Sequence, residues 1–78
     1  MNPRRLPVVS GKEVVRALRK AGFELRHVRG SHHVLTHPGP PRRMTSVPVH
    51  GNRAMPIGTL SAILEESNLS AEEFIALL

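Results

Sequence analysis

The sequence predicts an α+β fold in which a three-stranded antiparallel sheet carries helices on one of its faces. Three observations support this class. Two Ser-x-x-Glu segments, at Ser10 and Ser70, each precede residues of helical periodicity. Between them lie three short strand-like segments, and their connections are too short for a crossover between parallel strands. The length of 78 residues corresponds to one domain, taken here as residues 1–78.

The first helix is expected over residues 11–21. Residues 1–9 contain two prolines and are expected to form an irregular lead-in. Ser10 and Glu13 make a capping box, in which the hydroxyl and the carboxylate bind free amides at a helix start. An apolar face at helical spacing follows, formed by Val14, Ala17, Leu18 and Ala21. Gly22 is suited to end the helix, because glycine adopts the left-handed conformation without strain.

Three strands are expected over residues 23–29, 32–37 and 44–49. Gly30 and Ser31 form the turn between the first two. Proline cannot donate to a strand ladder, so the proline-rich segment 38–41 ends the second strand. For the same reason Pro48 places the third strand at an edge or marks its end. The result is an antiparallel meander, one face of which the helices must cover.

Two more helices are expected after a turn at residues 50–53. Pro56 suits the first turn of the next helix, and Asn68 ends it. Its apolar face consists of Leu60, Ile63 and Leu64. A second capping box, from Ser70 to Glu73, begins a short terminal helix, whose inward-facing residues are expected to be Phe74, Leu77 and Leu78. The predicted order is α-β-β-β-α-α.

Charge is distributed unevenly along the chain. The 11 Lys and Arg residues exceed the 6 Asp and Glu residues, for a net charge of +5. All the cations lie between Arg4 and Arg53, where two carboxylates leave a net +9, and the four carboxylates after Arg53 make the rest −4. A basic surface of this extent attracts polyanions. With two Phe and no Tyr or Trp, contacts to phosphates and duplex shape are favoured over base stacking.

Several classes of protein are disfavoured by what the sequence lacks. There is no cysteine, which excludes disulfides and thiolate zinc sites. No apolar run approaches the roughly 20 residues that cross a bilayer. The first residues carry no apolar segment of the kind found in secretory signals. A cytoplasmic location is therefore expected.

Five histidines lie between residues 27 and 50. A histidine can take and give a proton at cellular pH. Cleavage of RNA without a metal needs a base for the ribose 2′-hydroxyl and an acid for the 5′-oxygen leaving group. Cations nearby stabilise the charge that grows on the phosphate. Histidines beside a basic surface are therefore a sufficient set of groups for a ribonuclease that needs no cofactor.

The neighbouring His32 and His33 are the leading candidates for the base. Neighbours on a strand point to opposite faces, so one should face the helices and the other should be open to a ligand. Val34 and Leu35 give both faces an apolar member, so alternation does not decide between the two histidines. Gly30 allows the backbone to approach a phosphate closely, and the Ser31 hydroxyl is placed to orient an imidazole.

Other cations and histidines are candidates for RNA contacts, for turn positions or for a metal site. The candidates for RNA contacts are Lys12, Arg26, Arg29 and Arg53. A stripe of cations on the first helix is either a solvated face or part of the same surface; it consists of Lys12, Arg16, Arg19 and Lys20. His37 and His50, at strand ends, are expected to be solvated turn residues, with His50 suited to orient the loop that carries Arg53. A zinc site of His33, His37 and His50 is disfavoured, since cysteine, a nearby Asp and helical His-x3-His spacing are missing.

Three blocks of the sequence together resemble the HicA toxins of HicA–HicB toxin–antitoxin pairs. The blocks are GSHHVL at residues 30–35, VPVHGNR at 47–53, and Pro56 with GTLSAIL at 58–64. They occur in the expected order, and the similarity runs from about residue 10 to the last residue. One departure is Ala54-Met55, where many relatives carry an acidic residue and then an aliphatic one.

The resemblance implies a fold similar to double-stranded RNA-binding domains, with which the α-β-β-β-α-α order agrees. It implies an mRNA interferase, a metal-independent endoribonuclease whose partner is a HicB-type antitoxin. The family's catalytic histidine directly follows Gly-Ser, which corresponds to His32. Gly30, Ser31 and His33 are candidates for a supporting role, and a structural role is favoured over a catalytic one for His33. A non-catalytic module for structured RNA is the alternative, since it needs the same basic surface. A DNA-binding regulator is disfavoured, because no helix-turn-helix pattern appears.

Overall fold

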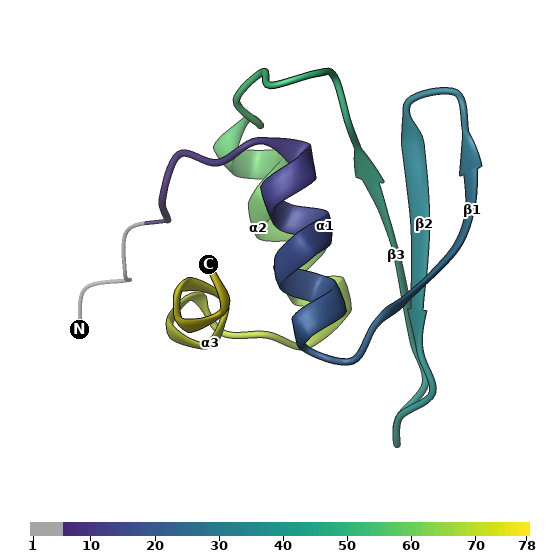
Figure 1. Ribbon diagram of the computed structural model, residues 1–78. Coiled ribbons are helices and arrows are strands. Elements are labelled where there is room, and N and C mark those ends of the chain that lie inside the picture. Colours follow the sequence, from purple (N-terminus) through teal and green to yellow (C-terminus); the bar gives the residue numbers. More distant parts are fainter. Residues whose placement is uncertain (1–5) are drawn as a thin grey trace.

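A computed structural model describes residues 6–78 of the chain. Its elements follow one another in the order α1-β1-β2-β3-α2-α3 (Figure 1). They are α1 Gly11–Lys20, β1 Glu24–Arg29, β2 His32–His37, β3 Arg43–Pro48, α2 Ile57–Ser67 and α3 Ala71–Leu77. This confirms the predicted α+β class and element order. The expected bounds shift by one residue at the end of α1, at the start of β1 and at both ends of β3.

Of the irregular lead-in expected over residues 1–9, residues 1–5 lie outside the described residues. Residues 6–9 belong to no helix or strand. None of the helices in the part of the chain from residue 6 onward is long and apolar enough to cross a membrane.

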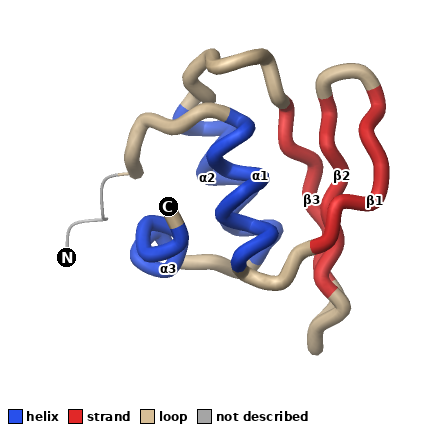
Figure 2. Tube along the Cα trace, viewed as in Figure 1, coloured by secondary structure: helices blue, strands red, loops and turns tan. Residues whose placement is uncertain are grey.

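The three strands form an antiparallel sheet in the order β1-β2-β3. Helices α1 and α2 lie on the same side of this sheet, and α3 packs against α1 (Figures 1 and 2). The opposite side of the sheet, called the open face below, carries no helix. Pro48 is the last residue of β3, and β3 is an edge strand. Pro48 therefore lies both on an edge strand and at a strand end, the two positions expected for it. A bulge between Leu25 and His27 interrupts the β1–β2 register.

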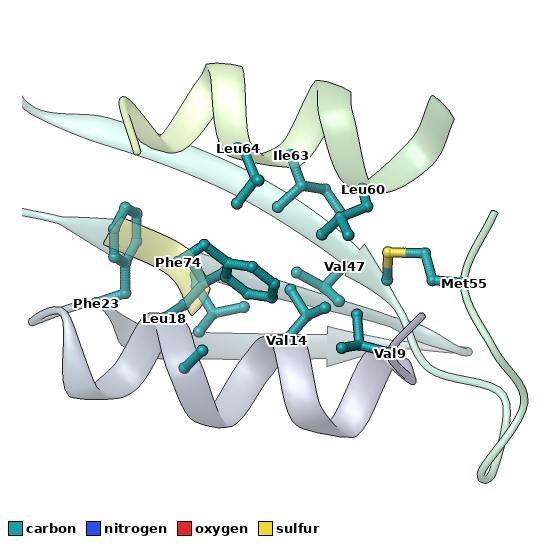
Figure 3. Close-up of a cluster of buried hydrophobic side chains, with 12 residues drawn as sticks. Val9, Val14, Leu18, Phe23, Val47, Met55, Leu60, Ile63, Leu64 and Phe74 are labelled. Atoms are coloured by element: carbon teal, nitrogen blue, oxygen red, sulfur yellow. The ribbon is translucent and has the colours of Figure 1, made fainter. Parts of the chain in front are cut away.

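The hydrophobic core fills the space between the helices and the sheet (Figure 3). Strand β2 contributes Leu35 to the core and β3 contributes Val47, because alternate residues of a strand point to the same face. Both side chains are fully buried. The helices supply Leu18, Leu60 and Phe74, which are also fully buried. Together these residues hold β2 and β3 rigidly beneath α1 and α2.

The prediction that Leu78 packs inward is wrong, because 48% of it is exposed. Helix α3 ends at Leu77, so Leu78 does not continue the face that Phe74 presents to the core. Both capping boxes are present: the hydroxyls of Ser10 and Ser70 each accept a hydrogen bond from the amide of the glutamate three residues later, and the amide of each serine donates to the carboxylate of that glutamate. Gly22, with φ +102°, and Asn68, with φ 58°, end α1 and α2 as expected.

One end of the sheet is closely tied to the start of α1. A Cβ added to Gly11 would meet the Pro48 carbonyl oxygen and would lie 3.0 Å from the Val49 Cα. The Met55 amide donates to the Val9 carbonyl over 2.7 Å, beside a bridge between Ser10 and Ala54. The segment between β3 and α2 is therefore held against the beginning of α1, at the end of the sheet where β2 starts (top of Figure 1).

Candidate functional site

His32 is the first residue of β2 and lies on the open face. Its imidazole is exposed, whereas the side chains of Leu35 and Val47, which point to the other face, are fully buried. Across the sheet it pairs with Arg29 on β1 and Pro48 on β3. The Nδ1 atom lies 3.3 Å from the Ser46 Oγ, and no side chain in the described residues hydrogen-bonds the Nε2 atom. The arrangement leaves Nε2 free to exchange a proton with a ligand.

His33 lies on the opposite face, toward the helices, between Val28 and Val47. It is half-buried, and its Nδ1 atom is buried without a hydrogen-bond partner in the described part of the chain. The pair therefore divides as strand alternation requires, with one imidazole against the core and one open. Of the two, His32 is the imidazole that a nucleic acid can reach.

The Gly30-Ser31 turn joins β1 to β2 beside His32. Gly30 has φ +59°, the conformation that two-residue hairpin turns place at glycine, and the space where its Cβ would lie is open. The Ser31 carbonyl accepts a hydrogen bond from the Val49 amide over 2.7 Å, which ties the turn to the segment after β3. The hydroxyl beside the His32 imidazole belongs to Ser46. From the sequence alone, the Ser31 hydroxyl is expected in this position. Only the β2–β3 register brings Ser46 there.

The four candidate RNA-contact residues are exposed but do not form one cluster. Arg29 is the cross-strand partner of His32 and shares the open face with it. Arg53 lies in the loop after β3, at the same end of the sheet. Lys12 is also at this end but belongs to the helical layer, where it lines a groove with Ser10, Arg16 and Asn52.

Arg26 is the candidate that the structure separates from the others. It lies at the β1 bulge, and its Nη1 atom is 3.5 Å from the Glu24 Oε1. That carboxylate balances part of its charge, so Arg26 offers a phosphate less attraction than Arg29 does. Both groups are largely exposed, which keeps the pair weak.

A groove of about 300 Å³ opens at the outer edge of β3, between the beginnings of α1 and α2. It is lined by Gly11, Pro48, His50, Arg53, Met55 and Thr59, among others. His50 is exposed, as expected for a turn residue, and its carbonyl accepts a hydrogen bond from the Arg53 amide over 3.0 Å. This tight turn holds both side chains at the same groove.

His37 is not the solvated turn residue that its position at a strand end predicted. Its Nδ1 atom lies 2.9 Å from the Gly39 amide, which donates to it, and 2.9 Å from an Arg43 nitrogen. Its ring packs edge-on against Phe23, with 5.1 Å between centroids, and the Arg43 guanidinium lies 5.6 Å from the centre of the Phe23 ring. His37 therefore holds the far end of the sheet together, a role that follows from the packing of three elements.

The three histidines of the disfavoured zinc site come from different parts of the sheet and its connections. His33 and His37 stand toward opposite ends of β2, and His50 lies beyond β3. Among residues 6–78, no three His, Cys, Asp or Glu side chains are grouped so that they could hold a metal ion.

Comparison with known proteins gives one clear match. The family model described as "HicA toxin of bacterial toxin-antitoxin" matches residues 11–69. The matched range covers every helix and strand except α3, and it includes the turn, His32, Ser46 and the groove. No curated protein matches the chain. Because the family model covers most of the 78 residues, the chain belongs to the HicA toxin family of bacterial toxin–antitoxin systems.

Proposed function

We propose that this HicA-family toxin is a metal-independent endoribonuclease that cleaves mRNA, with His32 as its general base. The observation that carries the proposal is the exposed imidazole on the open face, whose Nδ1 atom lies against Ser46 and whose Nε2 atom is free. Membership of a toxin family and the basic character of residues 4–53 support a nucleic-acid target.

The reaction begins at the ribose 2′-hydroxyl. The His32 Nε2 atom takes its proton, and the 2′-oxygen attacks the adjacent phosphate. The contact with Ser46 fixes the rotation of the ring, so that Nε2 stays turned toward solvent. Arg29, directly opposite on β1, stabilises the negative charge that grows on the phosphate.

RNA binding uses exposed cations near this end of the sheet. Arg29 is the cross-strand partner of His32 on β1, and Arg53 lies in the loop after β3. Lys12 extends the basic surface onto the start of α1, and Arg26, whose charge Glu24 balances in part, contributes less from farther along β1. The Gly30-Ser31 turn, with open space at Gly30, lets the backbone approach the phosphate.

The protein partner in this proposal is a HicB-type antitoxin that covers the open face. Such a partner blocks the His32 imidazole and presents acidic groups to Arg29 and its neighbours. Met44, which is 63% exposed, is aligned across the β2–β3 ladder with Thr36. It adds an apolar contact at the end of the open face away from His32.

The test compares the cleavage of a labelled mRNA fragment by the wild type and by His32→Ala, both in the presence of EDTA. The wild type is expected to shorten the RNA, and the variant to lose about 10²–10⁴-fold in kcat, the usual contribution of a general base. Thermal unfolding should change little, since His32 is exposed. The matched control is His27→Ala, which removes another exposed histidine and should cleave as the wild type does.

Three outcomes would contradict parts of the proposal. Cleavage by His32→Ala at the parent rate would exclude His32 as the base. Activity that EDTA abolishes and a divalent cation restores would exclude the metal-free mechanism. A wild type that shifts the RNA on a native gel and leaves it intact would be a binding module for structured RNA.

A further inference from the structure

Cleavage by a general base leaves one proton unaccounted for, the proton that the departing 5′-oxygen must receive. The groove at the outer edge of β3 holds a histidine and an arginine side by side, His50 and Arg53. Neither side chain is hydrogen-bonded within the described residues, and both are exposed. No carboxylate is among the residues that line this groove, so the charge of Arg53 is not balanced there.

This groove adjoins His32 through Pro48. Pro48 lines the groove and is also the cross-strand partner of His32. The hydrogen bond from the Val49 amide to the Ser31 carbonyl continues the β2–β3 ladder one step beyond Pro48. Val49 packs against the core, and His50 follows it directly at the start of the turn that leads toward α2.

Ser46 and His50 lie two residues before and two residues after Pro48, the cross-strand partner of His32, and Ser46 is a diagonal neighbour of His32 on β3. Diagonal neighbours have Cβ atoms about 7–8 Å apart, within reach of long side chains. Ser46 occupies one diagonal and contacts the His32 Nδ1 atom. His50 lies beyond Pro48 on the other side, in the groove that Pro48 also lines.

We propose that His50 is the general acid of the reaction and that Arg53 binds the scissile phosphate in this groove. The inference depends on the proposed function. His32 takes the 2′-hydroxyl proton, the 2′-oxygen forms a bond to phosphorus, and the bond from phosphorus to the 5′-oxygen breaks. The 5′-oxygen keeps that electron pair and takes a proton from His50. The products are a 2′,3′-cyclic phosphate and a free 5′-hydroxyl, with His32 protonated and His50 neutral.

The other histidines fit this role less well. His33 has a buried Nδ1 atom on the helix side, and His37 is engaged by Gly39 and Arg43 at the far end of the sheet. His27 is exposed on β1, opposite Val34, and is also a diagonal neighbour of His32. It lines none of the grooves described above, whereas His50 shares one with a cation.

The experiment uses an RNA oligonucleotide in which sulfur replaces the bridging 5′-oxygen at the bond that the wild type cuts. A thiolate leaves without protonation, so this substrate does not need a general acid. His50→Ala should cut the ordinary RNA about 10²–10⁴-fold more slowly than the wild type, and should recover most of that loss on the sulfur substrate. His32→Ala should remain slow on both, since the base is still required.

The outcomes separate the two proposals. If His50→Ala cuts ordinary RNA at the wild-type rate, or is equally slow on both substrates, His50 is not the acid. If His27→Ala shows the recovery and His50→Ala does not, the acid is on β1 and this inference is overturned. If the wild type cuts neither substrate, the proposed ribonuclease function itself has failed.

A matched pair of arginine variants tests the phosphate site. Arg53→Ala should lower kcat more than tenfold, because the phosphate charge grows in the transition state. Arg42→Ala removes the same charge from the opposite end of the sheet, in the β2–β3 connection, and should leave kcat unchanged. Equal kcat values for Arg53→Ala and the wild type would exclude Arg53 from the scissile phosphate. Both arginine variants are compared with the wild type by kcat and not by their affinity for RNA.

Discussion

At the residue scale, two adjacent histidines have different surroundings because they point to opposite faces of one strand. His33 is half-buried among apolar side chains, and its buried Nδ1 atom has no partner in the described residues. His32 is open to solvent and contacts a hydroxyl. The chemistry that the two residues can perform is therefore set by the face each occupies.

In the proposed mechanism, Ser46 positions the His32 imidazole through its contact with Nδ1. Ser46→Ala should lower kcat by up to about tenfold, because a hydrogen bond contributes about 1 kcal/mol and its loss lets the ring rotate. The KM for RNA should stay the same, and Ser46→Thr, which keeps a hydroxyl, should recover most of the rate. Steady-state kinetics on a short RNA measure both constants. A higher KM at unchanged kcat would instead identify Ser46 as a contact to the substrate.

At the element scale, the start of α1 is packed against the end of β3. Gly11 is buried there, and its missing side chain leaves room for the Pro48 carbonyl. The other end of the sheet is held by different contacts: Arg43 donates to the Ser67 carbonyl at the end of α2 over 3.1 Å, and Thr45 donates to Glu66 over 2.6 Å. These contacts keep β3 in place beneath both helices, and with it the register that brings Ser46 to His32.

Gly11→Ala tests the contact between α1 and β3. Alanine is normally the better helix former, by about 1 kcal/mol, but here its Cβ meets backbone that cannot move aside. We expect the substitution to lower the free energy of unfolding by about 1–3 kcal/mol, as overpacking does. The matched control is Gly58→Ala in α2, where the Cβ enters open space, and it should be neutral or stabilising by about 0.5 kcal/mol. Urea unfolding of both variants gives the comparison; a Gly11→Ala protein as stable as the wild type would contradict it.

At the scale of the whole molecule, the described cations and four of the six carboxylates occupy different parts of the fold. The described cations lie on α1, on the strands and in their connections, whereas Glu65, Glu66, Glu72 and Glu73 lie on α2 and α3. The cationic stripe of α1 lines a shallow groove of its own on the helical layer and does not share the open face with His32. A short RNA held at His32 therefore meets Arg29 before it meets this stripe.

The salt dependence of binding tests this arrangement. Binding of a short single-stranded RNA is measured in the His32→Ala background, which prevents cleavage. The association constant should fall linearly with salt on logarithmic axes, and Arg29→Ala should reduce the slope by about 0.7, the value for one lost phosphate contact. Arg19→Ala, which removes a charge from the stripe, should leave the slope unchanged for this RNA. Equal reductions by the two variants would place the stripe in the binding surface.

The sequence alone determined the features that depend on near neighbours. Helical periodicity, two capping boxes, Gly22 and Asn68 defined the helices, and turn residues and prolines defined the strands to within one residue. The charge distribution indicated a polyanionic partner, and alternation required that His32 and His33 face opposite ways.

Only the tertiary structure decided which of the two histidines is open, which hydroxyl lies beside it, and which cations share its end of the sheet. Those features depend on the β2–β3 register, on the face that α1 and α2 cover, and on the path of the chain from Val49 to Pro56. His37 likewise changed from an expected solvated residue to a packed one, because Phe23, Gly39 and Arg43 meet it from other parts of the chain. The periods of helices and strands are local properties of a sequence, whereas register and coverage are set by the packing of residues distant along it.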